Sequence, residues 1–229
     1  MSTTVITVDG PAGAGKGELS RRLAARLGFG LLDSGAIYRV LAYAARKAGL
    51  ALFDEESLCE EAAVLSLKFS IESDGVHVML GDEDVSAAIR TPETGKGASK
   101  VAAFPSVRKA LLQRQRDFRK EPGLVADGRD MGTVVFPDAP VKIFLDASAE
   151  VRARRRQLQL EQAGKECDYE SILRELKERD QRDRTRAVAP LKPAADAVLL
   201  DSSEMGIDEV FEAALKIVYD HLPDLNTNS

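Results

Sequence analysis

The sequence predicts an α/β fold in which a parallel β-sheet is covered by helices on both faces and is interrupted by an antiparallel β-insert. Three observations predict it. Short apolar runs that end in Asp or Gly alternate with helical patterns along most of the chain. A glycine-rich loop directly follows the first of these runs, and a stretch in the middle alternates strictly between apolar and polar residues.

Five short apolar runs are the expected strands of the parallel sheet. They cover residues 4–8, 29–32, 124–126, 141–145 and 197–200. Continuous apolar strands separated by helices are typical of a sheet that is buried on both faces. Ligands of such sheets bind beyond the carboxyl ends of the strands. We therefore expect Asp9, Asp33 and Asp127 near a site, unless some of them only cap helices.

The first run leads into the glycine-rich segment Asp9-Gly-Pro-Ala-Gly-Ala-Gly-Lys16-Gly17, which fits Gly-x4-Gly-Lys. Glycines allow positive φ angles and close approach, so backbone N–H groups of such a loop can wrap a polyphosphate. The following helix points the positive end of its dipole at the phosphates. Lys16 would reach the β- and γ-phosphates. The alternative is an ordinary Gly/Ala-rich turn between strand and helix.

The loop departs from the general phosphate-binding motif after its lysine. The general motif has Ser or Thr there, whose hydroxyl helps to hold Mg²⁺. This chain has Gly17, followed by Glu18. We therefore expect Mg²⁺ to be held mainly by phosphates and water, which suits its reluctance to lose its water ligands. This pattern favours small kinases over GTPases.

The middle of the chain predicts an antiparallel hairpin. Apolar residues at 65, 67, 69 and 71 alternate with polar ones, residues 73–75 (Ser-Asp-Gly) are typical of a turn, and the alternation resumes at 76, 78 and 80. Such a hairpin is solvated on one face. Because it interrupts the series of strands and helices, we expect residues 62–104 to form an inserted subdomain, with later helices returning to the core. A regular apolar face over 207–218 predicts the last helix.

Residues 148–187 are rich in charges of both signs, and two of their helical patterns carry arginines on one face. These faces are Arg152, Arg155 and Arg156, and then Arg179, Arg182 and Arg186 together with Asp183. One interpretation is a solvated helix with internal salt bridges. The other is an anion-binding face, because guanidinium groups repel one another unless anions neutralise them, as phosphates do bidentately.

The composition limits the class of protein. The 229 residues are 44% hydrophobic, enough for one core with an inserted subdomain. The net charge of −5 argues against extensive nucleic-acid binding. With no long apolar run and no signal-peptide pattern, we expect a cytoplasmic protein without a membrane partner. Cys59 and Cys167 form no disulfide, zinc or redox pattern. His77 and His221 are expected to be structural or solvated, so the chemistry runs without a His base.

Arginines from several segments accompany the phosphate loop. They are Arg39, Arg108, Arg129 and the cluster at 179–186. No nucleophile–base pair stands out. This combination suits transfer of a γ-phosphoryl group to an acceptor that is already anionic, because catalysis then consists of positioning and charge neutralisation. Taken singly, each arginine could equally be a surface residue or cap the end of a helix.

Five stretches that span nearly the whole chain carry a family resemblance. They are Ile6-Thr-Val-Asp-Gly-Pro-Ala-Gly-Ala-Gly-Lys-Gly17, Leu32-Asp-Ser-Gly-Ala-Ile-Tyr-Arg39, Ala98-Ser-Lys-Val-Ala-Ala-Phe-Pro105, Ala126-Asp-Gly-Arg-Asp-Met-Gly-Thr-Val-Val-Phe-Pro137 and Lys177-Glu-Arg-Asp-Gln-Arg-Asp-Arg-Thr-Arg-Ala-Val-Ala-Pro190. Together they resemble bacterial cytidylate kinases of the nucleoside monophosphate kinase group. The resemblance implies a P-loop core (1–61, 105–147 and 188–229), an acceptor-binding insert (62–104) and a helical lid (148–187). It also implies Mg²⁺-dependent conversion of ATP and CMP or dCMP to ADP and CDP or dCDP.

The resemblance also implies roles for individual residues. The donor contacts are Gly10, Pro11, Ala12, Gly13, Ala14, Gly15, Lys16, Gly17 and Glu18. The acceptor-phosphate contacts are Ser34, Arg39, Arg129 and Arg186. The cytosine contacts are Ser99, Arg108 and Asp130, and the ribose contact is Asp183. The catalytic cations are Lys16, the lid arginines Arg179 and Arg182 or Arg184, and Arg186.

Hydrogen-bond chemistry agrees with these cytosine contacts. Cytosine presents an amino donor and two acceptors, which a carboxylate and Arg or Ser can match. Uracil has a carbonyl in place of the amino group and would face the carboxylate unfavourably. One position departs from the family pattern, which usually has Thr where this chain has Glu18. A carboxylate there would repel phosphate unless it points to solvent.

Three other functions are alternatives to cytidylate phosphorylation. The same chemistry on UMP, AMP or another small anion is the nearest. A regulatory GTPase would want Ser or Thr after Lys16 and an Asn-Lys-x-Asp motif, and the sequence has neither. Nucleic-acid binding through 148–187 is disfavoured by the acidic balance and the interleaved carboxylates. We expect small-molecule nucleotides as the partners, and a monomer, because no exposed apolar stripe is evident.

Overall fold

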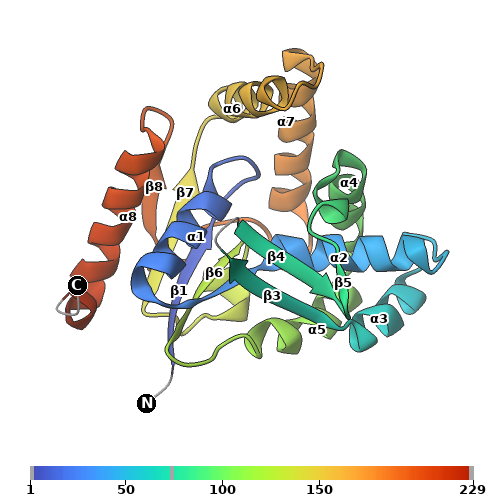
Figure 1. Ribbon diagram of the computed structural model, residues 1–229, viewed down its shortest axis with the longest axis horizontal. Coiled ribbons are helices and arrows are strands. Elements are labelled where there is room, and N and C mark those ends of the chain that lie inside the picture. The colour runs from blue at the N-terminus through green and yellow to red at the C-terminus, as the bar shows by residue number, and fades with distance from the viewer. Residues whose placement is uncertain (1–2, 73–74, 227–229) are drawn as a thin grey trace.

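The computed structural model describes residues 3–72 and 75–226, and a five-stranded parallel sheet forms the centre of this part of the chain (Figure 1). Its strands are β1 (Thr4–Asp9), β2 (Gly30–Asp33), β6 (Gly123–Gly128), β7 (Val141–Asp146) and β8 (Val198–Asp201). Their order is β2-β6-β1-β7-β8, and every neighbouring pair is parallel. The predicted parallel sheet is confirmed.

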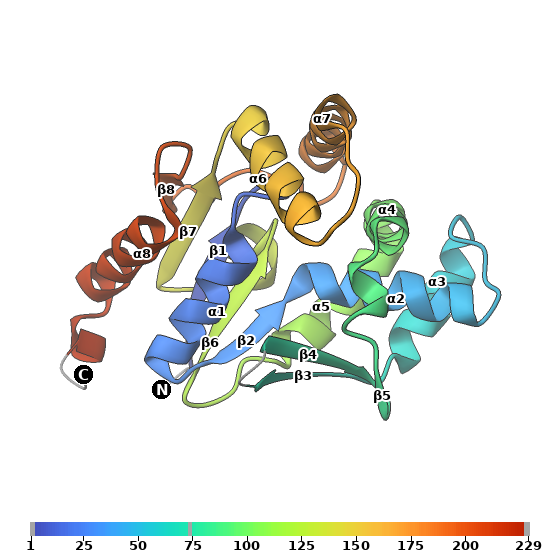
Figure 2. The same cartoon turned by 45° about the horizontal axis from the view of Figure 1, so that its top comes forward.

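Helices cover both faces of the sheet because successive residues of its strands point to opposite sides. Ile6 and Val8 of β1 belong to a core formed with α1 (Lys16–Leu27) and α8 (Ile207–His221). These two helices lie side by side over one face of the sheet (Figure 2). Val5 belongs to a second core, formed with α2 (Ser34–Lys47), α3 (Glu55–Val64) and α5 (Pro105–Arg116).

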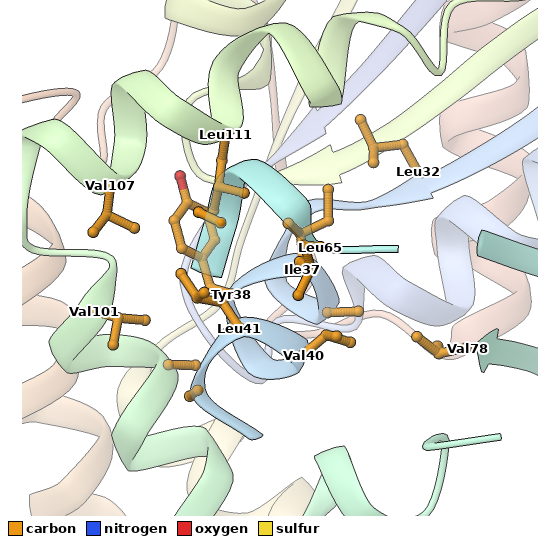
Figure 3. Close-up of a cluster of buried hydrophobic side chains, with 14 of the residues drawn as sticks. Leu32, Ile37, Tyr38, Val40, Leu41, Leu65, Val78, Val101, Val107 and Leu111 are labelled. Carbon is orange, nitrogen blue, oxygen red and sulfur yellow. The ribbon is translucent and has the colours of Figure 1, made fainter. Parts of the chain in front are cut away.

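The second core is centred on α2, whose run of small and branched apolar residues is almost wholly buried. Figure 3 shows Ile37 and Leu41 of this helix beside Leu65 and Leu111. All four of these side chains are 1% exposed or less. This packing holds α2 in place, and the helix begins directly after the carboxyl end of β2.

The middle of the chain forms a small antiparallel sheet, as predicted. Its strands are β3 (Leu67–Glu72), β4 (Gly75–Leu80) and β5 (Glu83–Asp84). Residues 73 and 74 of the predicted turn lie outside the described residues. The first strand begins later than the alternation suggested, because Leu65 caps the end of α3 and is buried in the core. The short η1 (Ala88–Arg90) and α4 (Pro92–Val101) follow, and α4 packs on α2.

The charge-rich segment forms two helices, α6 (Ala149–Gln162) and α7 (Tyr169–Thr185), which pack on each other beyond the carboxyl ends of the strands (Figure 1). One expectation was wrong. Arg186 does not continue the helical face of Arg179 and Asp183, because α7 ends at Thr185 and Arg186 has an extended backbone. The chain turns there, so the Arg186 side chain does not point in the direction that a continued helix would give it.

Two short turns complete the chain, the π-helical turn η2 (Met131–Val135) after β6 and η3 (Pro223–Asn226) after α8. None of the helices in the described part of the chain combines the length and the apolar character needed to cross a bilayer.

Candidate active site

The glycine-rich loop between β1 and α1 has a backbone that requires glycine. Gly10 has a φ of 150°, and a Cβ atom there would lie 2.0 Å from the carbonyl oxygen of Leu145. Gly15, directly before α1, has the left-handed φ of 97°. These angles let the loop turn sharply over the neighbouring strand β7 and then start the helix at Lys16.

Lys16 is buried at the base of this loop, with 5% of its surface exposed. Its Nζ donates a hydrogen bond of 2.9 Å to the Pro11 carbonyl and lies 4.0 Å from an Asp127 carboxylate oxygen. Burial and the nearby Arg129 lower the pKa of Lys16, and burial raises the pKa of Asp127. An anionic ligand beside Lys16 would favour its charged form.

Glu18 occupies the first turn of α1 and pairs with arginines of its own helix. Its carboxylate accepts a hydrogen bond of 2.6 Å from Arg21 and one of 2.8 Å from Arg22. Arg22 in turn reaches Asp208 of α8 at 2.6 Å. The hydrogen bond from Arg21 is the main reason that the pKa of Glu18 is lowered. The charge that would repel phosphate is therefore compensated within α1.

A pocket lies beyond the carboxyl end of β6, between α2, α4, α5 and α7. Eight of the residues predicted from the sequence line it together. They are Ser34, Ser99, Arg108, Arg129, Asp130, Arg179, Asp183 and Arg186. They come from five segments of the chain, and the topology of the sheet brings these segments to one edge.

Asp130 and Arg108 form the most buried ion pair of this pocket. Arg108 Nη2 donates to Asp130 Oδ2 at 2.5 Å, with the two side chains 7% and 3% exposed. The Arg186 guanidinium lies 3.6 Å from the other oxygen of Asp130. The Arg108 guanidinium also lies over the ring of Tyr38, 5.4 Å from its centroid. The pair offers a fixed donor and a fixed acceptor side by side.

Asp183 joins two further arginines. Its carboxylate accepts a hydrogen bond of 3.1 Å from Arg129 Nε and lies 4.0 Å from Arg179 Nε. Burial opposes the ionised form of Asp183, but Arg129 and Arg179 more than compensate, so its pKa is lowered.

Arg179 carries a cationic group with an unused donor. Its Nε is buried and makes no hydrogen bond within the described part of the protein. Burial, followed by the charge of Arg129, lowers the pKa of Arg179 to about 10. Arg39 adds a third like charge to this group. Cations held together with an unused buried donor provide a site for a multiply charged anion.

The two serines of the pocket differ in their hydrogen bonding. The Ser34 hydroxyl donates to Oε1 of Gln115 at 2.6 Å, and both residues are buried. The Ser99 hydroxyl is buried without a hydrogen-bond partner among the described residues, so it is available to a ligand. Gln115 lies on α5 and carried no motif that would have identified it in the sequence.

Three of the predicted acceptor-binding and lid residues lie outside this pocket. Arg39 is half-buried and donates to the Ile89 carbonyl at 2.9 Å, beside α4. Arg182 is exposed, lies 3.9 Å from Glu178, and lines an adjoining cavity with Ser99 and Arg186. Arg184 is exposed near the end of α7.

Arg152 of α6 links the glycine-rich loop to α7. The sequence placed Arg152 only on a charged helical face and did not reveal these contacts. Arg152 is 3% exposed, and its guanidinium donates to the carbonyls of Ala147 and Ala12 at 2.9 Å each. The same group pairs with Asp180 of α7 at 2.5 Å. Arg155 is half-buried and donates to the Ser202 carbonyl at 2.5 Å. These two arginines support the structure rather than a solvated surface.

The expected strand-end carboxylates have distinct partners. Asp33 caps α2 by accepting from the Ala36 amide at 2.9 Å, which was the alternative interpretation for such residues. Asp9 accepts from the amides of Met131 and Gly132 instead. Among the described residues, no group of three or more His, Cys, Asp or Glu side chains is arranged to hold a metal ion.

The sequence comparisons with known proteins agree with one another. The family model described as cytidylate kinase matches residues 6–220. The cytidylate kinase of Klebsiella pneumoniae is 60% identical over 219 residues, covering 95% of this chain and 96% of that protein. The cytidylate kinase of Aeromonas hydrophila is 58% identical over 224 residues, covering 98% and 97%. A shikimate kinase structure from Bacteroides thetaiotaomicron aligns with a TM-score of 0.47 at 12% identity, over 96% of this chain and 98% of that one.

Proposed function

The chain belongs to the cytidylate kinase family and catalyses ATP-dependent phosphorylation of CMP to CDP, and we propose that the pocket beyond β6 is its acceptor site. The observation that carries this proposal is the buried Arg108–Asp130 pair, which stands beside Arg129, Arg179 and Arg186. A base needs a small number of fixed donors and acceptors, and its phosphate needs cations. The pocket supplies both within one cavity.

We propose that Asp130, Arg108 and Ser99 read the cytosine. The Asp130 carboxylate accepts from the amino group, while Arg108 and the unpartnered Ser99 hydroxyl donate to the ring acceptors. Uracil would turn a carbonyl toward the carboxylate, so the site disfavours UMP. Asp183 accepts from the ribose, and both CMP and dCMP are substrates.

We propose that the cations of the site hold the phosphates of both nucleotides. Residues 10–18, with Lys16, bind the polyphosphate of ATP. Arg39, Arg129 and Arg186 bind the acceptor phosphate, together with Ser34. Arg179, with Arg182 or Arg184, neutralises the group in transfer. An anionic acceptor needs no general base, so the γ-phosphoryl group passes directly to it.

We propose that Mg²⁺ accompanies ATP and is held mainly by phosphates and water. The residues present fit this arrangement. Gly17 offers no hydroxyl, and an Asp127 carboxylate oxygen lies 3.6 Å from where a Cβ atom on Gly17 would stand. That carboxylate can accept hydrogen bonds from metal-bound water. When bound, Mg²⁺ supplies charge neutralisation at the phosphates.

We propose a division of labour that follows the sequence. Residues 62–104 form the acceptor-binding insert, residues 148–187 the lid, and the remaining segments the P-loop core. The lid closes over both substrates and excludes water. The large apolar side chains that are exposed, such as Phe53 before α3, Val64 at the end of α3 and Leu199 in β8, do not share one helix or strand face, which supports a monomer. The isolated cysteines support a cytoplasmic location.

The acceptor assignment is tested by Asp130→Asn. An amide at this position can donate to the uracil carbonyl as well as accept from the cytosine amino group. We expect the ratio of kcat/KM for CMP over UMP to fall at least about tenfold, as for loss of one hydrogen bond to a charged group. An unchanged ratio would show that Asp130 does not read the base.

A further inference from the structure

Asp9 connects the strand that carries the phosphate loop to the segment that carries the acceptor site. It is the last residue of β1, directly before Gly10, and only 5% of it is exposed. One carboxylate oxygen accepts from the Met131 amide at 2.8 Å, and the other accepts from the Gly132 amide, also at 2.8 Å. These are the first two amides of η2, the turn that follows Asp130.

The residue before a helical turn usually caps that turn with its own side chain, and Asp is among the strongest capping residues. Asp130 occupies this position before η2, yet its side chain makes no capping hydrogen bond. Its carboxylate faces Arg108 at 2.5 Å and Arg186 at 3.6 Å instead. Of the amides that Asp130 could cap, that of Gly132 is satisfied by Asp9, which also accepts from the Met131 amide.

Close packing keeps η2 in reach of Asp9. A Cβ atom on Gly132 would lie 3.0 Å from the Thr7 hydroxyl of β1 and 3.1 Å from Cδ of Lys142 of β7. The turn therefore lies directly against the two strands, and both amides remain aimed at the Asp9 carboxylate. Protein interiors resist shifts of such contacts.

We infer that Asp9 is a positioning residue for the acceptor site, because by capping η2 from the neighbouring strand it leaves the Asp130 carboxylate free to face the base. This inference rests on the proposed reading of cytosine by Asp130. Asp9, which directly precedes the glycine-rich loop, would then help to select the acceptor.

The variant Asp9→Asn tests this inference. Asn keeps the size of Asp but presents an N–H group to one of the two amides, so one hydrogen bond is lost. The freed amide then competes for the Asp130 carboxylate. We expect the ratio of kcat/KM for CMP over UMP to fall about tenfold, the loss expected for one such bond, while KM for ATP changes little. Asp201→Asn, at the exposed end of the edge strand β8, is the matched control and keeps the wild-type ratio.

A double-mutant cycle separates positioning from general damage. If Asp9 acts through Asp130, Asp9→Asn lowers the ratio no further in an Asp130→Asn background. An equal loss of kcat/KM for CMP and UMP in Asp9→Asn, or a fully additive double variant, would overturn the inference. Asp9→Ser is made in parallel. If neither Asp9 variant folds while Asp130→Asn does, a role confined to orienting Asp130 is contradicted.

The cycle also distinguishes this inference from the proposed function on which it rests. If Asp130→Asn alone leaves the CMP-over-UMP ratio unchanged, the assignment of Asp130 to the base fails. If Asp130→Asn lowers the ratio and Asp9→Asn does not, only the role of Asp9 fails.

Discussion

Single residues of the proposed acceptor site owe their properties to buried charges that neutralise one another. Asp130 stands between Arg108 and Arg186, and Asp183 stands between Arg129 and Arg179. Removing one partner of a buried pair leaves the other without compensation, which costs more than the pair contributes. Substitutions at this site should therefore have large effects, and the effects should depend on which charge is left behind.

Arg186→Ala removes a guanidinium that is 8% exposed and lies beside Asp130. Truncating one partner of a buried charge pair at a binding site costs roughly 2–5 kcal/mol, so we expect kcat/KM for CMP to fall about 100-fold or more. Steady-state kinetics with saturating ATP measure this. Arg174→Ala, an exposed arginine of α7 that contacts Ser171, should keep wild-type turnover. Near-normal turnover in Arg186→Ala would contradict the role of Arg186.

Asp9 should make stability depend on pH. Burial raises its pKa from 3.8 to about 6, so between these values the folded protein binds a proton that the unfolded chain has released. Stability is therefore lost as the pH rises through this range. Relative to Asp9→Asn, we expect the wild-type free energy of unfolding to fall by about 2 kcal/mol from pH 4 to 7. Denaturant unfolding at several pH values measures the difference.

Asp201 provides a control of opposite sign for this measurement. A hydrogen bond from Ser203 lowers the pKa of the Asp201 carboxyl, so the stabilisation from Asp201 is gained, not lost, as the pH rises. A difference between wild type and Asp9→Asn that does not vary with pH would contradict the raised pKa of Asp9.

Whole elements are held around the site by contacts that reach between them. Arg152 of α6 joins the carbonyl of Ala12 in the phosphate loop to Asp180 on α7. Lys96 of α4 reaches Glu175 of α7 at 2.8 Å on the exposed side. The buried contact fixes α6 and α7 to the glycine-rich loop, and the exposed one joins the proposed lid to the proposed insert.

Arg152→Ala should loosen the attachment of α6 and α7 to the donor loop. It leaves the Asp180 carboxylate without its buried partner, so we expect a loss of roughly 3–5 kcal/mol in unfolding free energy, together with a higher KM for ATP. Arg154→Ala is the control, because Arg154 is exposed and lies over the ring of Tyr169. Similar stability of the two variants would show that Arg152 does not hold the lid.

The elements show what the sequence could and could not predict. The five strands were predictable because burial on both faces leaves a continuous apolar run in the sequence. The hairpin was predictable because burial on one face leaves an alternation of apolar and polar residues. The contacts of Arg152, Gln115 and Asp9 were not, because each joins segments far apart in the chain and no spacing encodes them. The end of α7 before Arg186 was missed because helical spacing continues past the residue where the backbone turns.

The environment of the Glu18 carboxylate was only partly predictable from the sequence. The sequence showed a carboxylate beside the donor loop, where it could repel phosphate. Its hydrogen bonds to Arg21 and Arg22 follow from spacings of three and four residues on a helix. The further link from Arg22 to Asp208 depends on α8 packing against α1, which only the folded chain reveals.

In the whole molecule, the sheet brings the two proposed binding sites to the same edge. The donor loop follows β1, and the segment that carries Arg129 and Asp130 follows the adjacent strand β6. The proposed insert and the proposed lid meet at this edge, where Lys96 of α4 pairs with Glu175 of α7, and Arg179 and Asp183 of α7 line the proposed acceptor pocket. A donor and an acceptor bound there would meet between neighbouring strand ends, as direct transfer requires.

The central claim is that the acceptor pocket selects cytosine nucleotides for phosphorylation. Its most direct test is a coupled assay of ADP release with ATP, Mg²⁺ and CMP, dCMP, UMP, AMP or GMP as the acceptor. Turnover with CMP and dCMP far above turnover with the other three is the result we predict. Preference for another acceptor, or ADP release that does not depend on any acceptor, would contradict the reading of cytosine by Asp130, Arg108 and Ser99.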